Sequence, residues 1–294
     1  MTEKSQGRAL VLGLAAVLLW STVATAFKLA LAYLTPLQLL AIASVVSTLV
    51  LALAVSWQRA WGDVGEAWRN GRWRYIGLGF LNPFFYYFIL FKAYDLLPAQ
   101  QAQPLNYTWA LTLSLLAVPL LGQRLHGRDF VAMAMGYGGV LVIATRGDVL
   151  GLQFDSPLGV ALALGSTIIW ALYWILNARS QESPVVGLLL CFLTGLPWVL
   201  AAAWLSDGFP QDWNGVTAAV YVGFFEMGVT FMLWLGALKT AVHASRVSNL
   251  IFLSPFLSLI FISQILGESI HPTVYIGLLL IVGGVILQQW KRRN

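Results

Sequence analysis

The chain alternates between long apolar runs and polar connections, which are short except for the Arg- and Trp-rich stretch from Gln58 to Trp73. Ten runs approach the ~20 apolar residues that a helix needs to cross a bilayer, some after allowing for one polar interruption. They cover residues 9–30, 36–56, 74–94, 100–121, 128–145, 157–178, 184–205, 214–238, 243–264 and 273–290. None shows the alternation of apolar and polar positions that transmembrane strands require. The pattern therefore predicts an all-α membrane protein with ten transmembrane helices.

The hydrophobic pattern repeats itself halfway along the chain. Gly122, Leu125, His126 and Gly138-Gly139-Val140 recur 145 positions later as Gly267, Ile270, His271 and Gly283-Gly284-Val285. Duplicated hydrophobic halves are typical of secondary transporters. We therefore expect an N-terminal repeat at residues 1–147 with helices 1–5, and a C-terminal repeat at residues 148–294 with helices 6–10.

The positive charges predict how the halves lie in the membrane. With the N-terminus inside, 14 of the 17 Lys and Arg residues fall on the cytoplasmic side, leaving Lys28, Lys92 and Arg146 outside. This bias favours both termini in the cytoplasm. Five spans per half is an odd number, so the second half must enter from the opposite face. The ten helices are then expected to form an inverted five-plus-five repeat.

Composition narrows the class of protein further. A chain that is 59% hydrophobic and 10% charged has too little polar surface for a water-soluble domain. The pI is near 9.4, but the basic residues sit at the ends of apolar runs, so we expect no nucleic-acid partner. Three His and one Cys form no metal-ligand spacing, and we expect neither a metal nor a cofactor.

Glu226 is the only acidic residue well inside a predicted span. A charged carboxylate at the bilayer centre costs roughly 2.5–3.5 kcal/mol, so this side chain should face the bundle interior or water. There it could pair with a substrate ammonium group or exchange a proton. A protonated, purely structural glutamate is the alternative.

Three prolines inside the predicted spans mark candidate hinges. A proline removes a backbone donor and frees the carbonyl four residues earlier, which is tolerated where it lines a cavity. We expect hinges at Pro83, Pro104 and Pro255. Asn82 and Asn249 lie nearby and could bind polar groups of a substrate. Plain kinks that serve packing are the alternative.

The chain resembles the drug/metabolite transporter superfamily. The resemblance rests on ten short spans, the repeat, the paired Gly-Gly motifs and two junctions, Leu-Leu-Gly-Gln-Arg-Leu-His (120–126) and Ile-Leu-Gly-Glu-Ser-Ile-His (265–271). Within it the chain is similar to the EamA-type branch, and most like the YddG-type aromatic amino-acid exporters. That branch usually carries Gly-Glu at both junctions, a pattern that Glu268 fits and Gln123 does not. The resemblance implies an inner-membrane carrier whose pocket is formed by helices 1, 3, 4, 6, 8 and 9.

Aromatic residues within the spans are candidates for the walls of that pocket. Tryptophans near span ends are typical of the membrane interface, but Trp20, Trp109 and Trp170 lie deeper. By resemblance to the family, Tyr107, Trp109 and Trp170 would line the substrate site. Tyr86 and Trp20 are further candidates. Aromatic rings stack on apolar or aromatic groups, and the tyrosine hydroxyl and indole N–H can donate hydrogen bonds.

These features predict a secondary transporter that exports amino acids, aromatic ones included, by alternating access. A zwitterion needs an anionic partner for its ammonium group and neutral donors for its carboxylate. Glu226 with Asn82, Tyr107 and Trp109 would supply both. Lipophilic cations fit a carboxylate among aromatic rings equally well, so export of drugs or other small metabolites is the alternative.

Other classes of membrane protein fit the sequence less well. All three His sit near span ends, which disfavours a membrane hydrolase with a histidine base, and no filter loop of a channel is visible. We expect no catalytic residues. Apart from its substrate and the surrounding lipid, the carrier is expected to act as a monomer. Small-residue faces on helices 5 and 10 could instead mediate dimerisation.

Overall fold

The protein was analysed as a computed structural model that describes residues 5–122, 125–151, 154–177, 182–208, 210, 212–242, 247 and 249–289. Every regular element in this part of the chain is helical. In order they are α1 (Gln6–Leu31), α2 (Pro36–Trp57), α3 (Trp61–Gly79), η1 (Phe80–Phe85), α4 (Tyr86–Leu96), α5 (Ala99–Asn106), α6 (Trp109–Leu121), α7 (Gly127–Ala144), α8 (Pro157–Asn177), α9 (Pro184–Ser206), α10 (Trp213–Tyr221), η2 (Val222–Val229), α11 (Thr230–Thr240), η3 (Asn249–Leu253), α13 (Ser254–Leu266) and α14 (Pro272–Gln289).

These elements make up the ten predicted spans. Eight apolar helical segments of the described chain are 18 residues or longer, and Leu250–Leu266 and Pro272–Gln288 are shorter. Their ends follow local signals. Thr35 caps α2, with Pro36 in its first turn, and Gly122 ends α6 in a left-handed conformation (φ 66°). The predicted all-α membrane fold with ten spanning helices is confirmed; part of the 243–264 run lies outside the described residues.

One predicted connection is helical instead. The sequence led us to expect a long connection from Gln58 to Trp73, but α3 already begins at Trp61. Its helical geometry is interrupted at Gly71 (φ −146°, ψ 25°), which separates the first ten residues from the spanning part. The apolar pattern missed this helix because arginines, glycines and tryptophans are mixed in it.

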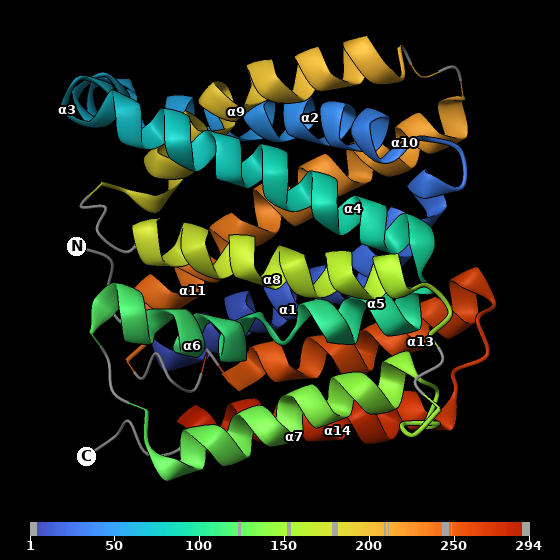
Figure 1. The fold of residues 1–294 in the computed structure, drawn as a ribbon. Coiled ribbons are helices and arrows are strands. Elements are labelled where there is room, and N and C mark those ends of the chain that lie inside the picture. The colour runs from blue at the N-terminus through green and yellow to red at the C-terminus, as the bar shows by residue number, and fades with distance from the viewer. Residues whose placement is uncertain are drawn as a thin grey trace. The chain divides into compact units, whose positions relative to one another are not determined.

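The chain packs as two compact units. Unit 1 comprises residues 1–88 and 180–266, and unit 2 comprises residues 89–179 and 267–294. Within unit 1, α1 packs along α11 and α13, and α2 packs against α9 and η2 (Figure 1). Gly79 lies so close to α9 that an added Cβ would come within 2.5 Å of the Cys191 carbonyl oxygen. Gly223 of η2 approaches the backbone of α2 at Ala43 in the same way.

Unit 2 contains a self-complementary helix pair, α7 and α14, which lie side by side in Figure 1. A Cβ on Gly139 would come within 2.5 Å of the Gly277 carbonyl, and a Cβ on Gly284 within 2.5 Å of the Ala132 carbonyl. Ala132 and Gly139 are the counterparts of Gly277 and Gly284, 145 positions apart. The two contacts are therefore equivalent, as a twofold axis relating the two helices requires. As α7 runs forward from 132 to 139, its partner runs backward, so the pair is antiparallel, in agreement with an inverted repeat.

The third span of each half leaves α-helical geometry near its middle. In the first half this happens in η1, and in the second half in η2; both are π-helical segments. Pro83 lacks the N–H that an α-helix needs, and Asn82 is extended (φ −146°, ψ 118°). Such π-helical turns occur frequently at functional sites. Both segments lie in unit 1 and contain the candidate residues Asn82, Pro83 and Glu226.

Candidate functional site

The Glu226 carboxyl group lies in η2, inside unit 1. Tyr87 donates a hydrogen bond from its hydroxyl to Glu226 Oε1 (3.3 Å), and Trp20 supplies a further, weaker interaction with the same carboxyl group. The second oxygen, Oε2, is buried and has no hydrogen bond of standard geometry to a described residue. Helices 1, 3 and 8 thus meet at one carboxyl group, one oxygen of which accepts no such bond from a described residue.

Aromatic rings surround this group on the side of α1 and α11. Trp20 makes edge-on contacts with Phe231 and Trp234, with ring centroids 5.5 Å and 5.4 Å apart. Closer to the start of the eighth span, the hydroxyls of Thr22 and Tyr221 are hydrogen bonded at 2.7 Å. An apolar wall with few polar groups is the environment in which a carboxylate interacts most strongly with a cation.

Helix 3 contributes a second unused acceptor. Asn82 is 2% exposed, and its Oδ1 has no hydrogen-bond partner among the described residues. The adjacent Pro83 packs on α9, where a Cβ on Gly195 would come within 2.6 Å of the proline Cδ. Tyr86 and Tyr87 follow on the same helix, both buried, with ring centroids 4.8 Å apart. Tyr86 and Asn82 therefore share a short stretch of helix 3 with Tyr87, which holds Glu226.

Asn249 and Pro255 lie at the ninth span. Asn249 begins η3, and its side chain lies outside the described part of the structure. Pro255 is the second residue of α13, where the 3₁₀-helical turn gives way to an α-helix. A proline in a first helical turn disturbs no intrahelical hydrogen bond.

In unit 2, a break in the fourth span separates α5 from α6. Pro104 lies inside α5, Tyr107 follows that helix in a turn, and Trp109 is the first residue of α6. Asn106 donates from Nδ2 to Ser166 Oγ on α8 (3.0 Å). The turn is thereby fixed to α8, and Trp109 is half-buried without a hydrogen bond or ring contact to any other described residue.

Trp170 belongs to an aromatic cluster on α8. It stacks on Tyr173 (5.5 Å between centroids) and meets the edge of Trp174 (5.8 Å). The Nε1 of Trp174 is buried and has no hydrogen-bond partner among the described residues. Sequence reasoning missed Trp174 and Tyr173, although their positions three and four residues after Trp170 place them on one side of a helix.

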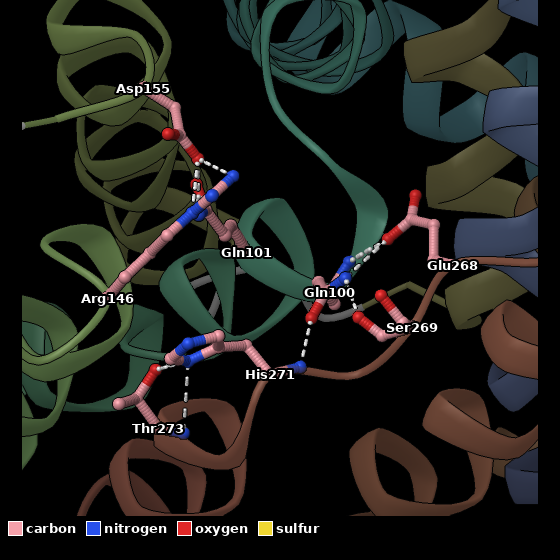
Figure 2. A network of polar contacts seen from close by, with 8 residues as sticks. All are labelled: Gln100, Gln101, Arg146, Asp155, Glu268, Ser269, His271 and Thr273. Carbon is pink, nitrogen blue, oxygen red and sulfur yellow. Dashed lines mark hydrogen bonds and ion pairs between the residues drawn. The ribbon is translucent and has the colours of Figure 1, made fainter.

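A polar network holds the N-terminus of α5 (Figure 2). Glu268 accepts hydrogen bonds from the backbone N–H groups of Ala99 (3.0 Å) and Gln100 (3.3 Å). The Gln100 side chain donates to Ser269 O and accepts from the backbone N–H of His271. The glutamate of the second junction therefore caps a helix of the opposite half. Gln123, its counterpart in the first junction, lies outside the described residues.

The titratable residues form no metal site in the described part of the chain. No group of three or more His, Cys, Asp or Glu side chains gathers there. Several acidic groups are instead paired with basic or amide groups, as where Arg146 and Gln101 both bind Asp155 Oδ2 (Figure 2).

Comparison with known proteins places these features in a family. The chain matches the EamA-like transporter family twice, over residues 7–145 and 157–288. A solved crystal structure superimposes with a TM-score of 0.67 over 97% of this chain and 98% of the solved chain. At 23% identity this likeness concerns the fold alone.

Several curated relatives are transporters by name. An aromatic amino acid exporter, YddG of Ancylobacter novellus, is 26% identical over 95% of this chain and 96% of its own length. An uncharacterized transporter, YvbV of Bacillus subtilis, is 24% identical over 94% of this chain and 90% of its own length. A probable amino-acid metabolite efflux pump of Escherichia coli is 25% identical over 74% of this chain and 78% of its own length.

The two family matches cover nearly all of the chain, one in each half. Together with the ten apolar helices, they identify a multi-pass membrane protein that moves small molecules and is not an enzyme. The chain belongs to the EamA-like transporter family.

Proposed function

We propose that this transporter exports amino acids, aromatic ones included, across the cytoplasmic membrane by alternating access. Glu226 receives the substrate ammonium group. The observation that carries this proposal is the buried Oε2 of Glu226, which has no hydrogen-bond donor within the described part of the chain, while Tyr87 donates to the other oxygen. A buried acceptor without a partner costs free energy, and a ligand that donates hydrogen bonds removes that cost.

Three N–H donors of an ammonium group suit the acceptors on helices 3 and 8. Asn82 Oδ1 is another buried acceptor that has no hydrogen-bond partner among the described residues of unit 1. Both groups accept, so they select a donor-rich cation over an anion. Relatives that carry the names of an aromatic amino acid exporter and a probable amino-acid metabolite efflux pump support the choice of an amino acid.

The remaining candidate residues complete the proposal. Trp20 and Tyr86 lie beside the Glu226–Tyr87 pair, and Asn249 supplies a further amide at the ninth span. Tyr107, Trp109 and Trp170 are the donors and rings for the substrate carboxylate and side chain. Pro83, Pro104 and Pro255 act as hinges. The repeats, residues 1–147 and 148–294, exchange roles as the carrier opens to either side, with both termini in the cytoplasm.

Export of lipophilic cations is the second candidate, because the same features favour it. A carboxyl group beside the rings of Trp20, Phe231 and Trp234 also fits a quaternary ammonium compound. Such a ligand has no N–H donor, so it would use the negative charge and the rings, and it would leave Asn82 without a partner.

Counterflow into proteoliposomes tests both candidates. The panel consists of labelled phenylalanine, tryptophan, leucine and a quaternary ammonium dye. We expect the wild type to exchange the amino acids and Glu226→Gln to lose most of this exchange, since it removes the charge but keeps the shape. Glu66→Gln makes the same chemical change at an exposed position of α3 and should exchange normally.

Two results would contradict the amino-acid proposal. One is full amino-acid exchange by Glu226→Gln. The other is exchange of the dye alone by the wild type, which would favour the second candidate.

A further inference from the structure

The segment from Trp57 to Arg74 forms a separate structural element at one end of unit 1. A tight turn with Arg59 in a left-handed conformation (φ 53°) ends α2, and α3 begins at Trp61. The non-helical Gly71 then separates Trp61–Asn70 from the spanning part of α3. Figure 1 shows the first turns of α3 nearly end-on while α2 runs across the view, so this short helix lies at a steep angle to the spanning helices of unit 1.

This short helix has two different faces. Val64 and Ala67 are buried against the protein. Trp61 and Trp68 are seven residues apart and therefore project from one side, next to the buried pair, with 49% and 37% exposure. An exposed tryptophan at the end of a spanning helix is typical of the headgroup region of a bilayer.

Three of the four arginines of the segment form no ion pair with a described residue. Arg59, Arg69 and Arg72 are exposed and form no salt bridge with any described residue. By contrast, Arg74 at the start of the spanning part is bound by both carboxylate oxygens of Glu182 at 2.9 Å. Three guanidinium groups are thus left to bind an external anion.

The distribution of charge fits a membrane surface. At roughly 3.6 residues per turn, Asp63 and Glu66 project away from the Trp61 side of the helix, whereas Arg69 lies nearer to it. Arg72 lies over the ring of Trp73, with Cζ 5.5 Å from the centroid, and Trp73 is 74% exposed. Arg69 therefore lies nearer to the tryptophan side of the helix than Asp63 and Glu66 do, and Arg72 lies beside the exposed Trp73.

We propose that residues Trp57–Arg74 form an in-plane anchor that binds the headgroups of anionic phospholipids. Trp61 and Trp68 enter the boundary between headgroups and acyl chains. Arg59, Arg69 and Arg72 bind lipid phosphate, which the planar guanidinium group matches with two parallel N–H donors. The steep angle at Gly71 allows this helix to lie along the bilayer surface while the rest of α3 crosses the bilayer.

Competition between lipids in vesicles that contain the full-length protein tests this anchor. Tryptophan quenching by brominated phosphatidylglycerol, compared with brominated phosphatidylcholine, reports how strongly the protein prefers the anionic lipid. We expect the combined variant Arg59→Gln, Arg69→Gln and Arg72→Gln to reduce this preference about tenfold or more. The preference of the wild type should also fall as salt is raised, because surface charges are screened.

Two further variants keep the test decisive if the glutamine variant fails to fold. Replacing the same three arginines by lysine should retain most of the preference, since the charge remains. Asp63→Asn with Glu66→Gln removes two negative charges and should increase it. The proposal is overturned if the preference is unchanged in the glutamine variant, or, should that variant not fold, unchanged in the Asp63/Glu66 variant.

Discussion

At the scale of single residues, the Glu226 carboxyl group connects three spanning helices. Tyr87 and Trp20 both reach it, so a change at any of the three alters the environment of the other two. Groups that share one hydrogen-bond network give non-additive effects when they are substituted. Tyr86 and Tyr87 are adjacent and both buried, and Tyr87 donates the hydrogen bond to the glutamate.

Trp109 is the cleanest probe of aromatic recognition, because it has no ring partner among the described residues, whereas Trp170 stacks on Tyr173. We expect Trp109→Ala to weaken transport of phenylalanine and tryptophan by about 1–3 kcal/mol, the scale of losing a large aromatic contact. Leucine transport should change less. Concentration dependence of counterflow for each substrate measures the difference, and equal losses for all three amino acids would exclude a stacking role.

The sequence pointed to some of the candidate residues described above and not to others. Glu226 and Trp20 stood out because a carboxylate and a deep tryptophan are unusual in apolar spans. Tyr86 was chosen as a candidate and Tyr87, which binds Glu226, was not, since the extended Asn82 and the π-helical turn shift the register that a regular helix would give. Trp174 was missed because nothing in the pattern shows that an indole N–H lacks a partner.

At the scale of elements, the spans were predictable and their internal breaks only in part. The apolar runs predicted the ends of most helices to within a few residues, because capping residues and charged residues stand at the ends of these runs. Prolines indicated the breaks in the third and fourth spans, but η2 contains no proline and was not foreseen. The helix at Trp61 was missed because its amphipathic character is visible only when the buried side is known.

The cap on α5 gives a prediction at this scale. Glu268→Ala removes the acceptor for two backbone N–H groups and should lower the free energy of unfolding by about 0.5–2 kcal/mol. Glu268→Gln keeps one acceptor oxygen and should fall between alanine and the wild type. Thermal unfolding in detergent measures the series, and an alanine variant as stable as the wild type would contradict the cap.

The close contact between α7 and α14 gives a second prediction about the packing of the helices. Gly139→Val forces a side chain against the Gly277 carbonyl and should destabilise the protein by about 1–3 kcal/mol or more. Gly138→Val adds the same side chain one residue earlier, where nothing lies within 4 Å, and serves as the matched control. Unfolding temperatures of the two variants should differ clearly; equal values would mean that this close approach contributes little.

At the scale of the whole molecule, orientation in the membrane is open to a direct test. The chain has a single cysteine, Cys191, which is buried in α9. In a Cys191→Ala background, new cysteines at Ser5 and at Asn294 should both react with a membrane-impermeant maleimide only after the cytoplasmic face is exposed. Labelling of the two ends from opposite faces would exclude an even number of spans.

The twofold contact of α7 and α14 also has a consequence for assembly of the carrier from separate polypeptides. Both copies of the contact lie within the helices, and neither uses the connection between Ala144 and Pro157. A chain cut in that connection would leave two polypeptides that still carry matching surfaces. When the two fragments are co-expressed as separate polypeptides, they should associate in the bilayer and restore transport.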